Sequence, residues 1–121
     1  MKDVTVLIVE DEGIVALDLR TQLTDMGCTV VGVALSGRRA IEMAAQTRPD
    51  LVLMDVRLKG DIDGVQAAQA ISDRFGTPIV FLTALVDKET MERSKAIKGC
   101  GYLGKPFTGS GLREVIEAAL A

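Results

Sequence analysis

Short apolar runs alternate with amphipathic segments along the whole chain, and this alternation constrains the fold more than any other feature. Continuous apolar runs of this length are typical of strands that are buried on both faces. Parallel strands joined by helical crossovers build a sheet with helices on both faces. We therefore predict an α/β, doubly wound (βα)5 fold. The predicted strands are residues 4–9, 29–34, 51–54, 78–82 and 102–103.

Capping residues and helix-stopping residues delimit the helical segments between these strands. Apolar residues recur at spacings of three and four over residues 16–26, as on the buried face of a helix. Gly27 follows at the point where a helix commonly ends in a left-handed residue. The other signals are caps at Ser36, Asp87 and Ser110, a stop at Pro49, and helical spacing over 64–75 and 87–98.

Composition and charge exclude several classes of function. Fourteen basic and 17 acidic residues give a formal charge of −3, so no basic excess favours direct binding of nucleic acid. The chain has no histidine, and Cys28 and Cys100 stand far apart, which excludes zinc sites and histidine-based catalysis. No apolar run approaches the roughly 20 residues that span a bilayer. We expect one cytoplasmic domain over residues 1–121, with no membrane contact.

Polar side chains stand directly after four of the predicted strands. Glu10 and Asp11 follow the first strand, Asp55 the third, Thr83 the fourth and Lys105 the fifth. In open α/β sheets these carboxyl ends form the ligand-binding crevice. Converging carboxylates repel one another unless a cation lies between them, and Mg²⁺ prefers such oxygen ligands. A carboxylate in this setting can also act as a nucleophile toward phosphorus.

Five segments, taken in order, resemble one known family. They are VLIVEDE at 6–12, PDLVLMD at 49–55, DG at 63–64, VFLTA at 80–84 and GYLGKPF at 101–107. Together they resemble the receiver domain of bacterial two-component response regulators over essentially the whole chain. The resemblance implies a flavodoxin-like fold with strand order 2-1-3-4-5. It also implies a regulator, not an enzyme, that accepts a phosphoryl group from a sensor histidine kinase or a phosphotransfer protein.

The resemblance assigns the acidic residues to a magnesium-dependent phosphoacceptor site. Asp55 would be the phosphoryl acceptor and also a magnesium ligand. Asp11 would bind Mg²⁺ directly, Glu10 would bind it through water, and Arg57 would bind it through its backbone carbonyl. Glu10 replaces the aspartate that is more usual in the family, and its longer side chain should still reach the metal.

The resemblance also assigns the residues that contact the phosphoryl group and pass on the signal. Thr83 would donate a hydrogen bond to the phosphoryl group, and Lys105, preceding a cis bond to Pro106, would pair with it. Tyr102 would turn inward when Thr83 moves. The output surface, for an output protein or a homodimer, would be the helix 87–98, the strand 102–103 and the last helix. Its charged residues are Arg93, Lys95, Lys98, Arg113, Glu114 and Glu117.

Two further departures from the common family pattern concern the loop after Asp55. Lys59 stands where a proline is frequent, and the loop is one residue longer. The family positions that tune phosphate lifetime are Arg57 and Leu85 here, and the apolar Leu85 offers nothing to orient an attacking water. We therefore expect the aspartyl phosphate to outlast that of a Leu85→Glu variant, whose carboxylate could orient a water.

Three other functions are compatible with parts of this pattern. A flavodoxin-like electron carrier would share the fold, but the acidic run at 10–12 would repel a flavin phosphate. A phosphatase with an aspartyl nucleophile would need an acid two residues after Asp55, where Arg57 stands. A receiver that regulates by binding alone would not need a complete phosphoacceptor site, yet every position of that site is filled here. The sequence leaves open whether the receiver stands alone or belongs to a larger regulator or hybrid kinase.

Overall fold

Five parallel strands form the centre of the structure, a computed structural model that describes residues 1–84, 88–97 and 99–121. The sheet order is β2-β1-β3-β4-β5, which confirms the predicted fold and strand order. The strands are β1 (Thr5–Val9), β2 (Thr29–Ala34), β3 (Leu51–Asp55), β4 (Ile79–Thr83) and β5 (Gly101–Gly104).

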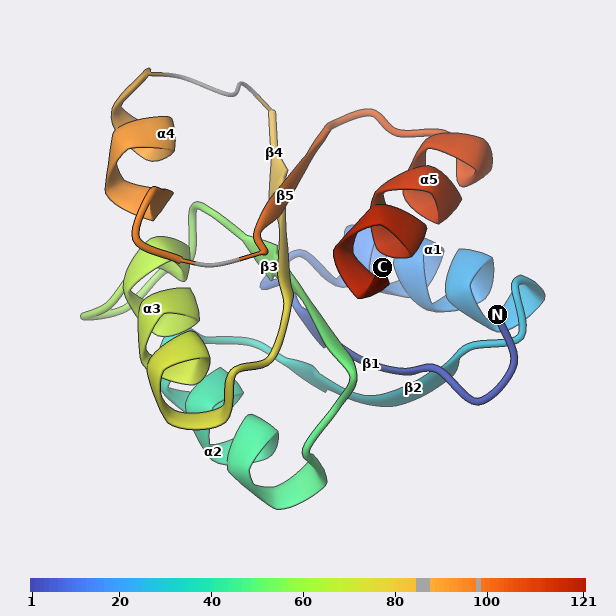
Figure 1. Ribbon diagram of the computed structural model, residues 1–121, viewed down its shortest axis with the longest axis horizontal. Coiled ribbons are helices and arrows are strands. Elements are labelled where there is room, and N and C mark those ends of the chain that lie inside the picture. Colours follow the sequence, from blue (N-terminus) through green and yellow to red (C-terminus); the bar gives the residue numbers. More distant parts are fainter. Residues whose placement is uncertain (85–87, 98) are drawn as a thin grey trace.

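Helices cover both faces of this sheet (Figure 1). One apolar cluster lies between the sheet and the pair α1 and α5, and a second lies between the sheet and the pair α2 and α3. All residues of β3 and β4 are buried, as expected for strands covered on both sides. The helices are α1 (Gly13–Asp25), α2 (Gly37–Thr47), α3 (Gly64–Phe75), α4 (Lys88–Ser94) and α5 (Gly109–Leu120).

Most of the observed strand ends differ from the predicted ones by one residue. Asp55 pairs with Leu82 and therefore belongs to β3 as its last residue. Thr83 pairs with Gly104 at the end of β4. The predicted strand 102–103 extends to a glycine on each side, because hydrogen bonding to β4 outweighs the low strand preference of glycine. The first predicted strand starts one residue later, and the fourth starts after Pro78.

Most predicted helix ends are confirmed, and one cap is wrong. The Ser36 side chain accepts a hydrogen bond from the backbone N–H of Arg39, and Gly27 has the expected positive φ of 88°. Ser110 does not cap the last helix, because Thr108 accepts the hydrogen bond from Gly111 N–H and the helix begins two residues earlier than expected. Two nearby hydroxyl residues are equivalent cap candidates in the sequence, and only the backbone path distinguishes them.

The fourth helix ends earlier than predicted. It closes at Ser94, whose hydroxyl donates to the backbone carbonyl of Thr90. The chain then continues in turns, in which the N–H groups of Lys95 and Ile97 bond to carbonyls three residues earlier. Ile97, only 3% exposed, packs into the core. Asp87 and Lys98, the predicted cap and the predicted last residue, lie outside the described residues.

Candidate functional site

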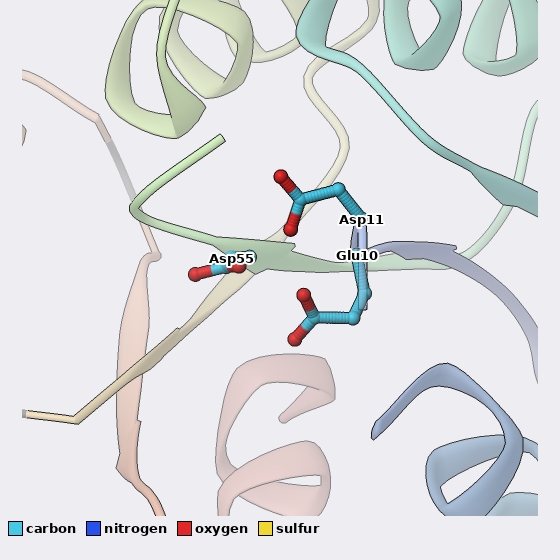
Figure 2. A group of neighbouring side chains, drawn as sticks. All are labelled: Glu10, Asp11 and Asp55. Carbon is cyan, nitrogen blue, oxygen red and sulfur yellow. The ribbon is translucent and has the colours of Figure 1, made fainter. Parts of the chain in front are cut away.

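Three carboxylates meet at the carboxyl ends of two neighbouring central strands. Glu10 and Asp11 follow β1, and Asp55 ends β3; one ligand oxygen from each lies within 4.8 Å of the others. Figure 2 shows the three side chains extending from these adjacent strand ends. The structure thus brings together the residues that the sequence predicts for the acidic site, although β1 and β3 are far apart in the chain.

Lys105 is the cation of this cluster. Its Nζ lies 2.9 Å from Glu10 Oε1 and 3.7 Å from Asp55 Oδ1. The Glu10 side chain is fully buried and that of Asp55 is 6% exposed, so these charges face each other in a poorly solvated place. The sequence did not indicate that Lys105 lies closer to Glu10 than to Asp55, because the two partners are 95 residues apart.

Backbone N–H groups orient each acidic side chain. Arg57 N–H donates to Asp55 Oδ1 at 3.1 Å, Glu12 N–H donates to Glu10 Oε2 at 3.2 Å, and Lys59 N–H donates to Asp11 Oδ2 at 3.3 Å. The loop after Asp55 therefore contacts two of the three carboxylates. These donors fix the direction of the carboxylates, and the other oxygen of Glu10, Oε1, is held by Lys105 Nζ at 2.9 Å.

Gly64 allows the first turn of α3 to pack against the end of β3 at Asp55. A Cβ placed on Gly64 would lie 1.9 Å from the backbone oxygen of Asp55 and 2.9 Å from the Cα of Val56. Asp63, the preceding residue, caps α3 by accepting from Gln66 N–H, and the Gln66 side chain accepts from Asp63 N–H. The Asp-Gly pair of the sequence thus fixes how α3 begins, directly beneath Asp55.

The electrostatic surroundings raise the pKa of two groups, Asp55 and Lys105. Burial, the contact with the Glu10 carboxylate and its charge raise the pKa of Asp55 to about 7, against the lowering effect of Arg57 N–H and Lys105. Burial by itself lowers the pKa of Lys105, but its hydrogen bond to Glu10 and the nearby acidic charges raise it above its ordinary value. Asp55 therefore carries unfavourable negative charge, which a bound cation would stabilise.

Replacing Asp55 by asparagine should stabilise the protein most at alkaline pH. The folded-state pKa lies above the unfolded value of 3.8, so the wild type loses stability as pH rises from about 4 to 7. The gain from Asp55→Asn should be about 2 kcal/mol larger at pH 8 than at pH 5.5. Urea unfolding of both proteins in chelator tests this. An equal gain at both pH values would contradict the assigned environment of Asp55.

Thr83 and Tyr102 lie at the β4 and β5 side of the site. Thr83 is 5% exposed at the end of β4, and its carbonyl accepts from Lys105 N–H. The Tyr102 ring stacks on Phe81 with centroids 5.8 Å apart. The predicted cis bond from Lys105 to Pro106 is confirmed. Leu85 lies outside the described residues.

The donor set fits a hard divalent cation. Carboxylate oxygens, with room for backbone carbonyls and water, are the ligands that Mg²⁺ prefers, and the three clustered carboxylates supply them. An aspartate between such a cation and a lysine ammonium can act as a nucleophile toward phosphorus, because both positive groups stabilise the charge of the phosphoryl oxygens.

No helix in the described part of the chain is long and apolar enough to cross a membrane.

Known proteins show the same fold and sequence pattern. The family described as response regulator receiver domain matches residues 6–117. The transcriptional regulatory protein PdtaR of Mycobacterium tuberculosis is 40% identical over 96% of this chain and 56% of its own length. The phyllosphere-induced regulator PhyR of Methylorubrum extorquens is 32% identical over 95% of this chain and 43% of its own length. The chain thus spans about half the length of these curated relatives.

Solved structures agree with this result. The signal receiver domain of a modulated diguanylate cyclase from Desulfovibrio desulfuricans superposes with a TM-score of 0.90 at 39% identity, covering 98% of this chain and 94% of that one. The chemotaxis protein CheY4 of Vibrio cholerae superposes with a TM-score of 0.87 at 28% identity, covering 97% of this chain and 98% of that one.

Proposed function

Because the chain belongs to the response regulator receiver domain family, we propose that residues 1–121 form one receiver domain whose phosphoryl acceptor is Asp55. The observation that carries this proposal is the buried acidic cluster at the ends of β1 and β3, with the Lys105 ammonium beside it. A structural aspartate would not need two further carboxylates and a lysine around it. The domain is a regulator and not an enzyme; its only chemistry is phosphotransfer and slow hydrolysis of its own aspartyl phosphate.

Magnesium completes the site in this proposal. Asp11 and Asp55 would bind it directly, Glu10 through water, and Arg57 through its backbone carbonyl. When bound, the cation neutralises acceptor and phosphoryl oxygens. Glu10, which holds Lys105 at 2.9 Å, would keep the ammonium at the edge of the site where an incoming phosphoryl group arrives.

The phosphotransfer step uses the Asp55 carboxylate as nucleophile. One of its oxygens forms a bond to phosphorus while the bond from phosphorus to the donor, a histidine nitrogen of a kinase or phosphotransfer protein, breaks. Lys105 pairs with the phosphoryl oxygens and Thr83 donates a hydrogen bond to them. These contacts stabilise the charge that the phosphoryl group brings into the buried site.

The signal then reaches the surface formed by α4, β5 and α5. We propose that the bond between Thr83 and the phosphoryl group changes the packing of Tyr102, which lies on the neighbouring strand. The surface would control an output protein or a second copy of the chain. The relatives PdtaR and PhyR are longer than this chain, so the output of the complete protein is itself part of the proposal, as are its cytoplasmic location and its lack of direct nucleic-acid contact.

Phosphorylation by a small acyl phosphate in the presence of Mg²⁺ tests the proposed chemistry without any partner. The intact mass should increase by one phosphoryl group. Phosphorylation by a phosphohistidine protein tests the proposed class of partner, because such a donor must contact the surface around Asp55 to deliver its phosphoryl group.

An apolar groove beside Lys105 is where we propose that such a donor docks. Ile14, Val15 and Phe107 line it together with Lys105, which itself lies 3.7 Å from Asp55. Ile14 is 87% exposed and Leu17, three residues further along α1, is 65% exposed. Neighbouring exposed apolar side chains of this kind mark protein interaction sites.

Replacing Ile14 by aspartate should slow transfer from a cognate phosphohistidine protein by about tenfold, because one central apolar contact commonly contributes that much to an interface. Transfer from a small acyl phosphate should not change. Leu120→Asp, which alters an exposed leucine at the far end of α5, serves as the control. Equal slowing with both donors, or in both variants, would exclude this groove as the docking site.

A further inference from the structure

A buried serine in α4 contacts the proposed switch residue. Ser94, the last residue of α4, is fully buried, and its Oγ lies within hydrogen-bonding distance of the Tyr102 hydroxyl. Nothing in the sequence marked Ser94, since a serine near a helix end is commonly solvated or a cap. A buried hydroxyl requires a partner, and here it has one on each side.

The direction of the hydrogen bonds follows from the partners of Ser94. Its hydroxyl proton points to the backbone carbonyl of Thr90, with the oxygens 2.8 Å apart. The Ser94 oxygen is therefore left as an acceptor for the Tyr102 O–H. The Cys100 thiol lies 3.5 Å from the Tyr102 oxygen and 3.8 Å from the Ser94 backbone carbonyl, so its proton has two acceptors. The Tyr102 hydroxyl thus donates to Ser94, and Ser94 donates to the Thr90 carbonyl.

The last turn of α4 is attached to two other elements. Arg93, the preceding residue, forms an ion pair at 2.7 Å with Asp63, the cap of α3. Asp63 closes the loop that begins at Asp55. The same turn of α4 thus contacts the loop of the acidic site through Arg93 and the ring of Tyr102 through Ser94, so the acceptor of the Tyr102 hydroxyl is held in a defined place.

We propose that Ser94 is a positioning residue that holds the Tyr102 ring against Phe81 by accepting its hydroxyl hydrogen bond. The proposal rests on the proposed function only in giving Tyr102 a signalling role. The physical reason is that loss of the acceptor leaves the phenol O–H without Ser94 in the position stacked on Phe81, whereas a ring turned away from Phe81 can bond to water. Ser94 therefore sets how readily the ring leaves its place beside β4.

The fluorescence of Tyr102 reports this position directly, because the chain has one tyrosine and no tryptophan. In Ser94→Ala the ratio of inward to outward rings should fall by about tenfold, and acrylamide should quench the tyrosine fluorescence more strongly than in the wild type. Lys95→Gln is the control, because it removes only an exposed ion pair between Lys95 and Glu92, which flank Ser94 in the sequence. It should leave the acrylamide quenching unchanged. Wild-type quenching in Ser94→Ala, or equal increases in both variants, would overturn the proposal.

A double-mutant cycle separates this contact from a general loosening of α4. Ser94→Ala should raise the unfolding equilibrium constant by about tenfold in the wild type, but by less than about threefold when Tyr102 is phenylalanine. Additive effects would overturn the proposal. Both tests use unphosphorylated protein, so they remain readable if Asp55 accepts no phosphoryl group. Labelling of Asp55 by a small acyl phosphate should be the same in Ser94→Ala and wild type, since Ser94 does not touch the acceptor.

Discussion

Gly64→Ala is expected to destabilise the protein by about 3 kcal/mol or more and to displace Asp55, the proposed phosphoryl acceptor. The added Cβ would lie 1.9 Å from the Asp55 backbone oxygen, so the two atoms would overlap unless the backbone moves. The neighbouring atoms belong to the main chain of β3 and the residue after it, so no side chain can rotate away to make room. Either α3 must move outward or the end of β3 must bend.

Urea unfolding measures this loss, and Gly13→Ala is the matched control. Gly13 begins α1 much as Gly64 begins α3, yet a Cβ at Gly13 meets nothing within 4 Å. We expect Gly13→Ala to be neutral or more stable by up to about 1 kcal/mol, because it lowers the entropy of the unfolded chain. Equal stability of the two variants would show that the close approach of α3 to Asp55 is not required.

The architecture and most of the acidic site could be predicted from the sequence. Apolar runs separated by amphipathic segments determine a parallel sheet, and a parallel sheet brings the residues after its strands to one edge. Glu10, Asp11 and Asp55 were therefore expected at the same edge, and they meet there because β1 and β3 are neighbours. The strand order did not follow from periodicity, because the alternation of strands and helices is the same for several orders. It came from the resemblance to receiver domains.

Contacts between long side chains could not be predicted in the same way. Glu10 follows β1 and Lys105 follows β5, and these two strands do not pair with each other. Their ion pair therefore depends on how far the two side chains extend over the edge of the sheet. The role of Ser94 depends on where α4 ends, and the helix is shorter than its polar sequence suggested. The need for glycine at 64 was visible only as part of a family motif, and its cause, contact with the Asp55 carbonyl, is a property of the packed backbone.

Asp55→Asn is expected to abolish phosphorylation. The amide is not a nucleophile toward phosphorus, while its size and shape match those of the carboxyl group, so the fold should be kept. The pKa of Asp55, raised to about 7, implies that the variant is at least as stable as the wild type near neutral pH. A loss of labelling in this variant therefore cannot come from unfolding. Asp73→Asn, on the exposed face of α3, is the control and should be labelled like the wild type.

We also expect phosphorylation to require a divalent cation, because of the negative charge of the site. Without a divalent cation, a phosphoryl group would enter a pocket that already holds three carboxylates, and the Lys105 ammonium alone would face all of this negative charge. Chelation should therefore prevent labelling of the wild type, and Mg²⁺ should restore it. Replacing Lys105 would remove the remaining positive group, but the acceptor itself would stay in place.

Mass spectrometry of the protein after incubation with a small acyl phosphate tests the proposed function most directly. With Mg²⁺, the wild type should gain one phosphoryl group, and peptide mapping should place it on Asp55. Labelling should be absent in chelator and in Asp55→Asn. Labelling of Asp55→Asn to the wild-type extent, or labelling undiminished by chelator, would contradict a magnesium-dependent phosphoacceptor at Asp55.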